Sequence, residues 1–220
     1  FEEKNYLKTQ KLYLEILDHY PKNLSVLKNI ALAFYYGGSL KDAEIILKKI
    51  IEINKKEPNS LLMLILILEK QDKINETKKY IDFGLKENIL DKHWVIKKKL
   101  ILPTIFESLK DIEESRSELL QYIQEILDSN KKISLDIETQ LIKPVQFDLS
   151  YNQYDNLEIN KKCVNFFRKI YPQLNKVHQL QNFPNSKIRM GFVSDYLTDH
   201  TIGKLFKGII LNLDKNKFDI

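Results

Sequence analysis

Cysteine is nearly absent from the sequence, since Cys163 is the single one among 220 residues. An intrachain disulfide therefore cannot form. This composition fits a reducing compartment, so we expect a cytoplasmic protein. Long apolar runs are also missing, because the longest, residues 61–68, is far shorter than the roughly 20 residues that a membrane-spanning helix needs. We therefore expect no membrane span.

Glycine and proline are scarce, with six residues of each, which argues for long helices rather than a loop-rich β fold. Arginine is scarcer still: only Arg116, Arg168 and Arg189 are present, and lysine supplies the rest of the positive charge behind a net charge of +5. Proteins that bind nucleic acids usually gather positive charge on one face and use arginine forks. Here the lysines are interleaved with acidic residues, which indicates a solvated helix surface and no nucleic-acid partner.

Motifs for metals and phosphates are missing as well. The four histidines are His19, His93, His178 and His200, and no two of them have HxxxH or HExxH spacing. Because a cysteine cluster is also absent, the sequence predicts no metal site. It contains neither a G-x-G-x-x-G segment nor a P-loop, so we expect no phosphate-binding glycine loop.

A 34-residue repeat runs through the first part of the chain. The small residues Thr9, Ala43 and Thr77 are 34 positions apart, and larger apolar residues follow four and seven positions later, as Leu47 and Ile50 do after Ala43. This period is typical of tetratricopeptide (TPR) repeats, and the small residue would let two paired helices approach closely. Unrelated amphipathic helices are the alternative interpretation.

The same register predicts a first helix in each repeat and the turns between helices. Apolar residues precede each small residue at helical spacing: Leu27, Ile30, Ala31 and Phe34, then Leu61, Leu64, Ile65 and Leu68. Gly37 and Gly38 predict the turn within the middle repeat, and Pro21 and Pro58 predict turns between repeats. The helical pattern continues over residues 88–102. We assign residues 1–101 to the repeats, with the first repeat partial.

Residues 102–186 are expected to form a helical connector. Ser108 and Asp111 form a capping pair for a helix that continues through Leu127, and a second short helix is expected to end near residue 141. A further amphipathic helix is expected over residues 156–171.

Three smaller features of this connector follow from its pattern. Cys163 lies on the inward face of the last helix, where it is a core residue rather than a nucleophile, because nothing nearby would lower the pKa of its thiol. Residues 177–186 are expected to be a linker. An extended stretch is expected where apolar residues alternate, at Phe147, Leu149 and Tyr151.

The stretch that organises the rest of the chain is residues 187–211, KIRMGFVSDYLTDHTIGKLFKGIIL. It predicts a short strand buried in a sheet up to Val193, then a polar loop, then a helix with Asp199 or Thr201 as its N-cap. His200 lies at the junction, beyond the carboxyl end of the strand, where ligands bind in open α/β sheets.

The two ends of the chain carry a further expectation. The sequence begins at Phe1 rather than at a methionine, and residues 217–220 have the pattern of another strand's beginning. We expect both ends to be cuts through a longer protein.

Three segments resemble one known family. SDYLTDH followed by TIGKLF, LPTIFES, and PVQFDLSYNQYDN are similar to segments of O-GlcNAc transferase and SPINDLY-type enzymes, glycosyltransferase family 41. The resemblance implies a mostly α fold. It would comprise a TPR-type α-solenoid with a helical connector, followed over residues 187–220 by the first β-α unit of a Rossmann-like GT-B lobe.

The same resemblance implies a function. Such an enzyme moves a sugar, first of all GlcNAc from UDP-GlcNAc, to Ser or Thr of a protein acceptor held by the TPR groove, without a metal. His200 would be catalytic, as base or as positioning residue, and Ser194, Asp195 and Lys204 would bind substrate. Some relatives have a second histidine at the position of Lys204. A role that depends on that second histidine would therefore not carry over to this chain. Donor contacts in the family come mainly from a second lobe, so residues 1–220 are expected to be catalytically incomplete.

Two alternatives stay open. His200 could cap its own loop against Asp195 or Asp199 without any catalytic role. The protein could also be a non-catalytic TPR scaffold that binds a peptide, with the C-terminal unit as a cap. Residues after Ile220 would discriminate, because a long run of alternating strands and helices with a nucleotide-binding segment would favour the enzyme.

Overall fold

The computed structural model describes residues 6–176 and 187–220, apart from the side chains of residues 6–10, 13, 146 and 147. The predictions for the side chain of Thr9, for His178 and for the linker at 177–186 lie outside the described residues. The chain divides into two units, Phe1–Lys176 and Val177–Ile220, which are described separately. None of the described helices is long and apolar enough to cross a membrane.

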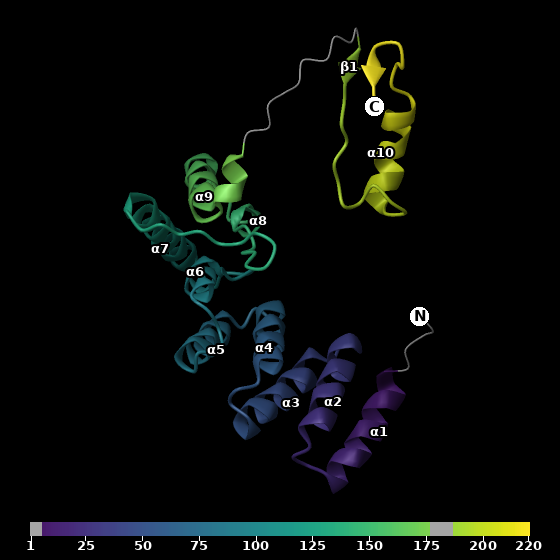
Figure 1. Ribbon diagram of the computed structural model, residues 1–220, viewed down its shortest axis with the longest axis vertical. Helices are drawn as coiled ribbons and strands as arrows, with labels where there is room; N and C mark the ends of the chain where they lie inside the picture. The colour runs from purple at the N-terminus through teal and green to yellow at the C-terminus, as the bar shows by residue number, and fades with distance from the viewer. Residues whose placement is uncertain (1–5, 177–186) are drawn as a thin grey trace. The chain divides into compact units, whose positions relative to one another are not determined.

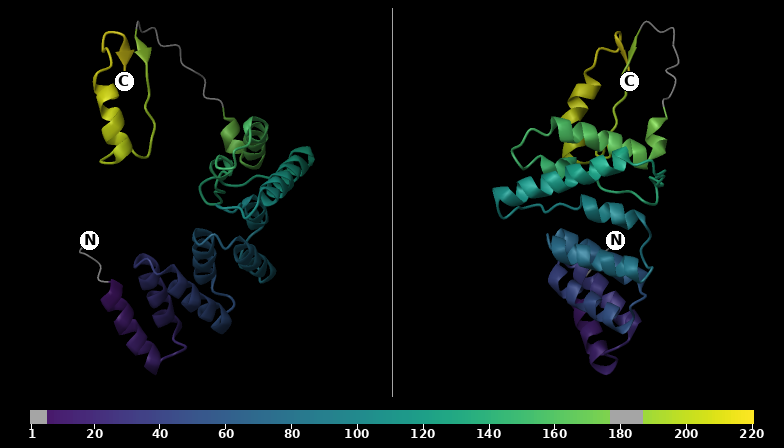
Figure 2. Two further views of the ribbon diagram at one scale, coloured as in Figure 1. Left: turned by 180° about the vertical axis from the view of Figure 1, so that it is seen from behind. Right: turned by 90° about the vertical axis from the view of Figure 1, so that its left-hand side faces the viewer.

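The regular secondary structure of the first unit, among its described residues, consists of helices (Figure 1). Its helices are α1 (Tyr6–His19), α2 (Leu24–Tyr36), α3 (Leu40–Ile53), α4 (Pro58–Lys70), α5 (Ile74–Lys86), α6 (His93–Leu100), α7 (Leu109–Asp128), α8 (Gln146–Leu149) and α9 (Leu157–Ile170), followed by a 3₁₀ turn, Pro172–Asn175. From α1 to α6, each helix packs on the helix before it and the helix after it, as the views of Figure 2 also show. This order confirms a mostly α fold that is consistent with a solenoid.

The small residues of the repeat lie where their side chains are fully buried. Ala43 is 0% exposed, as is Thr77, whose hydroxyl also donates to the carbonyl of Lys73 at 3.0 Å. Leu47, Ile50 and Ile81 are buried in the same core. The predicted inward positions of α3 and α5 are therefore confirmed.

The turns between the helices agree with the predictions in part. Gly38 has a φ of +82°, a conformation that favours glycine, and it follows the end of α2 as predicted. Pro58, in contrast, is not in a turn but is the first residue of α4. A proline is tolerated there because the first helical residue needs no intrahelical N–H bond.

The prediction of continuous helix over residues 88–102 is wrong, since α6 covers only His93–Leu100. Asn88 has a φ of +56° and ends α5. The N–H groups of Ile89 and Leu90 then both donate to the carbonyl of Gly84, at 2.8 and 3.1 Å, which closes the end of α5. A Cβ on Gly84 would lie 2.6 Å from the Leu90 side chain, so a larger residue at this position would force the packing of Leu90 to shift.

A second core lies beneath α7 and α9. The N–H of Asp111 donates to the hydroxyl of Ser108 at 3.1 Å, which confirms the predicted cap of α7. Cys163 is buried on the inward face of α9, and burial raises the pKa of its thiol to about 11. Its interpretation as a core residue agrees with this position. The other buried members of this core are Ile96, Leu100, Leu119, Ile123, Leu135, Ile142, Val145, Leu149, Ile159, Phe166, Ile170 and Tyr171.

Two predictions in the connector are wrong. The chain between α7 and α8 contains no helix among the described residues, because the N–H of Leu135 donates to the carbonyl of Ile170 at 2.8 Å and draws this stretch along α9. The stretch around Leu149 is not extended but forms α8. The buried hydroxyl of Tyr171 accepts from the N–H of Ile142 and donates to the carbonyl of Gln140, both at 2.8 Å, which holds the preceding chain in place.

The second unit contains strand β1 (Ile188–Arg189), helix α10 (Thr201–Leu211) and strand β2 (Phe218–Asp219). The strands pair in parallel, with Ile188 opposite Phe218. The predicted strand at the chain's end is confirmed. The prediction of a buried strand reaching Val193 is wrong, because β1 has two residues and Val193 is 100% exposed. A two-stranded sheet with one helix has too few elements to cover both faces.

Candidate functional site

The candidate site lies in the loop that joins β1 to α10. Figure 1 shows the chain leaving β1 in an extended path and turning into α10 at its far end. His200 is the N-cap of α10: its Nδ1 accepts a hydrogen bond from the N–H of Ile202 at 3.2 Å. The predicted caps, Asp199 and Thr201, are therefore wrong. The reason is that His200 is the last residue with extended backbone, and its ring nitrogen reaches the free N–H groups of the first turn.

This contact favours one tautomer of the neutral His200 imidazole. A nitrogen that accepts an N–H bond is unprotonated, so in the neutral imidazole the proton is on Nε2. The ring is also held against Tyr196, with ring centroids 4.5 Å apart. His200 is exposed, and its Nε2 can donate a hydrogen bond to an anionic oxygen. In this tautomer it cannot take a proton from a hydroxyl.

Lys204, four residues further along α10, forms an ion pair with Asp199 at 2.9 Å. Both side chains are well exposed, so the pair orients Lys204 more than it stabilises the fold. The two residues border a hollow of about 470 Å³, which we call the Lys204 hollow. It is lined by Leu197, Thr198, Asp199, Gly203, Lys204, Lys207, Ile210 and Leu211.

The other predicted substrate-binding residues are placed differently. The hydroxyl of Ser194 accepts from the N–H of Tyr196 at 3.1 Å and shapes the loop. Asp195 is exposed. Neither residue, nor His200, lines the Lys204 hollow. The structure thus brings Lys204 to a hollow and His200 to the helix start, without joining all four residues in one cavity.

Gly203 is a residue of this site that sequence reasoning did not use. A Cβ at this position would lie 2.2 Å from the carbonyl oxygen of Thr198 and 3.0 Å from that of Tyr196. The loop therefore crosses directly over the first turn of α10. Glycine has a low helix propensity, so a glycine in the first turn of a helix suggests that another part of the backbone packs closely against it. This low propensity was the signal by which the sequence could have pointed to Gly203.

A second candidate surface lies on the first helices of the repeats. Leu32 and Leu66 occupy the same repeat position, 34 residues apart, and both are 41% exposed. Tyr36 and Leu62, one helical turn away from them, are exposed as well. We call these four residues the apolar stripe. Because Leu32 and Leu66 recur at one repeat position, this face is a candidate for binding a partner.

Comparison of the chain with protein-family models, with curated proteins and with solved structures finds no match in any of the three. The geometry of the two candidate surfaces therefore carries the functional argument.

Proposed function

We propose that this chain is part of a protein O-glycosyltransferase that moves a sugar from a nucleotide donor, UDP-GlcNAc first of all, to Ser or Thr of a protein. The observation that supports this proposal is the parallel pairing of β1 with β2 around α10, with His200 at the junction. In parallel α/β structures, ligands bind beyond the carboxyl ends of the strands. The Rossmann-like character of this unit and the TPR identity of the helices are part of the proposal.

The chemistry of sugar transfer assigns a role to His200. Departure of the nucleotide leaves a negative charge on a phosphate oxygen. Hydrogen-bond donors that already point at this oxygen lower the activation barrier of the transfer. His200 would donate from Nε2 to this oxygen, because its Nδ1 is engaged by the N–H of Ile202. The geometry therefore favours positioning and charge stabilisation over the role of base. Lys204 would add a positive charge beside the same end of α10, and Ser194 and Asp195 would shape the loop.

The acceptor protein would bind along the apolar stripe. Leu32 and Leu66 repeat at one register, so an extended segment of the acceptor could contact both with side chains on one side. The work of such an enzyme on intracellular acceptors is consistent with the cytoplasmic location that we propose. No nucleic acid and no metal cofactor are part of this mechanism.

The test uses the full-length protein, incubated with a set of UDP- and GDP-sugars and candidate acceptors, with transfer followed by mass spectrometry. We expect transfer from one donor class. His200→Ala and His200→Asn should both lower turnover by about 10²- to 10⁴-fold, the range of a lost acid–base or charge-stabilising group. Asn preserves helix capping, so it separates chemistry from folding. Full activity of His200→Asn would remove His200 from the mechanism.

A non-catalytic scaffold is the second candidate, and the apolar stripe with the capping role of His200 favours it. A scaffold would bind a partner through Leu32 and Leu66 and would transfer no sugar from any donor. Partner binding that is lost in Leu66→Asp, in a full-length protein without transferase activity, would decide for the scaffold.

A further inference from the structure

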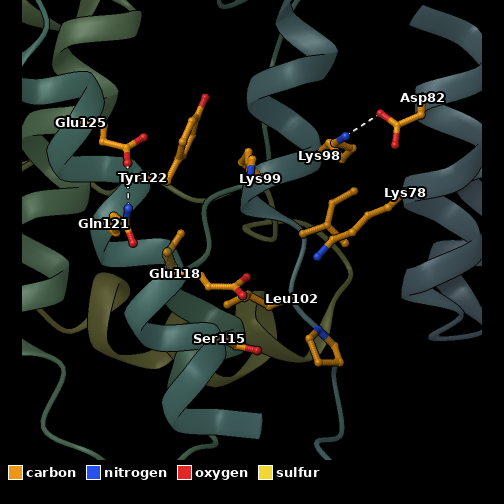
Figure 3. A pocket seen from close by; sticks show the side chains of 13 residues that line it. Lys78, Asp82, Lys98, Lys99, Leu102, Ser115, Glu118, Gln121, Tyr122 and Glu125 are labelled. Atoms are coloured by element: carbon orange, nitrogen blue, oxygen red, sulfur yellow. Dashed lines mark hydrogen bonds and ion pairs between the residues drawn. The ribbon is translucent and has the colours of Figure 1, made fainter. Parts of the chain in front are cut away.

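A hollow of about 620 Å³ lies among α5, α6 and α7, within the first unit (Figure 3). We call it the Lys78 hollow. It is lined by Lys78, Asp82, Lys98, Lys99, Ile101, Leu102, Pro103, Ser115, Glu118, Leu119, Gln121, Tyr122 and Glu125. None of these residues belongs to the apolar stripe, to the loop of His200 or to the Lys204 hollow, so the site is separate from the proposed transferase chemistry.

Lys78 is the unusual group in this hollow. Its side chain is half-buried, and Figure 3 shows it extending from α5 toward the space between α6 and α7. Among the described residues, its ammonium has neither a hydrogen bond nor an ion pair. Lys98 differs from it, because its ammonium is paired with the carboxylate of Asp82. A half-buried ammonium without a direct partner is costly, and an anion from solution would lower that cost.

The charges that line the hollow are mixed, with three lysines against Asp82, Glu118 and Glu125. Burial is the main cause that lowers the pKa of Lys78, and among the nearby charges Glu118 raises this pKa while Lys99 and Lys98 lower it. The carboxylate of Glu118 is the strongest single charge that acts on Lys78. The same carboxylate faces the hollow from α7, so it would repel a ligand with a second negative charge. A ligand with one negative charge, placed beside Lys78, therefore meets less repulsion from these carboxylates than a polyanion does.

Part of the remaining wall is apolar, beside the polar side chains of Ser115, Gln121 and Glu125. Leu102, Pro103 and Ile101 form one side, and the half-buried ring of Tyr122 forms another. Burial and the charge of Glu125 raise the pKa of the Tyr122 phenol, so the ring stays neutral at physiological pH. Such walls suit a flat or branched hydrocarbon body attached to the charged group.

We propose that the Lys78 hollow binds a small organic monocarboxylate. Its carboxylate lies against the ammonium groups of Lys78 and Lys99, and its apolar body lies against Tyr122, Leu102 and Pro103. Lys78 supplies the charge-assisted hydrogen bond, and Glu118 excludes polyanions.

Benzoate is the probe that tests this site, with binding to residues 1–220 and to the full-length protein measured by NMR titration. Lys78→Met keeps the length of the side chain and removes its charge, so it should weaken benzoate binding at least about tenfold, as expected for one charge-assisted hydrogen bond. Glu118→Gln should strengthen binding, because it removes a repelling charge. Lys79→Met, at the exposed neighbouring position, is the matched control and should change nothing.

Three outcomes would overturn the proposal. The first is the lack of saturable benzoate binding up to the solubility limit. The second is equal binding by wild type and a Lys78→Met variant with an unchanged circular dichroism spectrum and melting temperature. The third is equally strong binding of benzyl alcohol, which has the ring without the charge. Tighter binding of phenyl phosphate than of benzoate would contradict the exclusion by Glu118.

Discussion

The carboxylate of Glu44 accepts a hydrogen bond from the ammonium of Lys73 at 2.7 Å, and this ion pair joins α3 to the residue that precedes α5. The other carboxylate oxygen accepts from Lys48 at 2.6 Å, and the Gln71 amide donates to the first at 2.8 Å. Glu44 is only 5% exposed, whereas the side chains of Lys48 and Lys73 are 31% and 36% exposed, so the network lies at the edge of the core. They tie one repeat to the next through charge as well as through packing.

We predict that Glu44 makes the free energy of unfolding depend on pH in the acidic range. Burial by itself would raise the pKa of Glu44, but hydrogen bonds from Lys48, Lys73 and Gln71 lower it to about 2. A carboxyl group with a lowered folded-state pKa stabilises the fold above its unfolded pKa, near 4.5. This stabilisation, at most about 3 kcal/mol, is lost as the pH falls from about 4.5 to about 2.

Chemical unfolding at a series of pH values measures this effect. Glu44→Gln should be less stable than wild type at pH 7 and should lose less stability than wild type on acidification. Glu52→Gln, at an exposed position of α3, is the control. If Glu44→Gln and wild type had parallel stability curves between pH 5 and pH 2.5, the coupling would be absent.

The packing of α3 gives a second prediction. Ala43 is fully buried, so Ala43→Leu should overpack the helix interface and lower the free energy of unfolding by about 1–3 kcal/mol. Ile45→Leu, a change at a 63% exposed position of the same helix, should have little effect. Denaturant titration compares the two variants, and a loss of only a few tenths of a kcal/mol in Ala43→Leu would contradict the 34-residue register.

The third prediction is that alanine substitutions at two glycines of α10 change the stability of the helix in opposite directions. Gly203→Ala places a Cβ against the carbonyl oxygen of Thr198, so the loop must move and the unit should be destabilised. Gly208→Ala meets nothing within 4 Å and should stabilise the helix by up to about 1 kcal/mol, because alanine favours helix over glycine. Hydrogen exchange of the α10 amides measures both effects. Equal protection in the two variants would mean that the loop does not cross the helix at Gly203.

The cap of α10 gives a fourth prediction. His200→Ala removes the acceptor for the N–H of Ile202 and should cost about 1 kcal/mol of helix stability. His200→Asn should restore most of that stability, because asparagine is a strong N-cap residue. Exchange of the Ile202 amide reports the cap directly, and equal exchange in wild type and His200→Ala would show that the cap does not form in solution.

The sequence by itself determined the features that depend on neighbouring residues. The inward positions of α3, around Ala43, follow from the spacing of apolar residues along one helix. The start of α7 follows from Ser108 and Asp111, three residues apart. These signals are local, so their structural result can be read within a few turns of chain.

Only the tertiary structure decided the features that depend on distant residues. The stretch around Leu135 lies beside the end of α9 because the N–H of Leu135 donates a hydrogen bond to the carbonyl of Ile170. The sequence around Leu135 does not reveal this distant partner. The contacts of Glu44 reach Lys73, 29 positions away. In the sequence, Lys78 is indistinguishable from the many surface lysines. Its burial and its lack of a direct partner follow only from the packing of α6 and α7 around it.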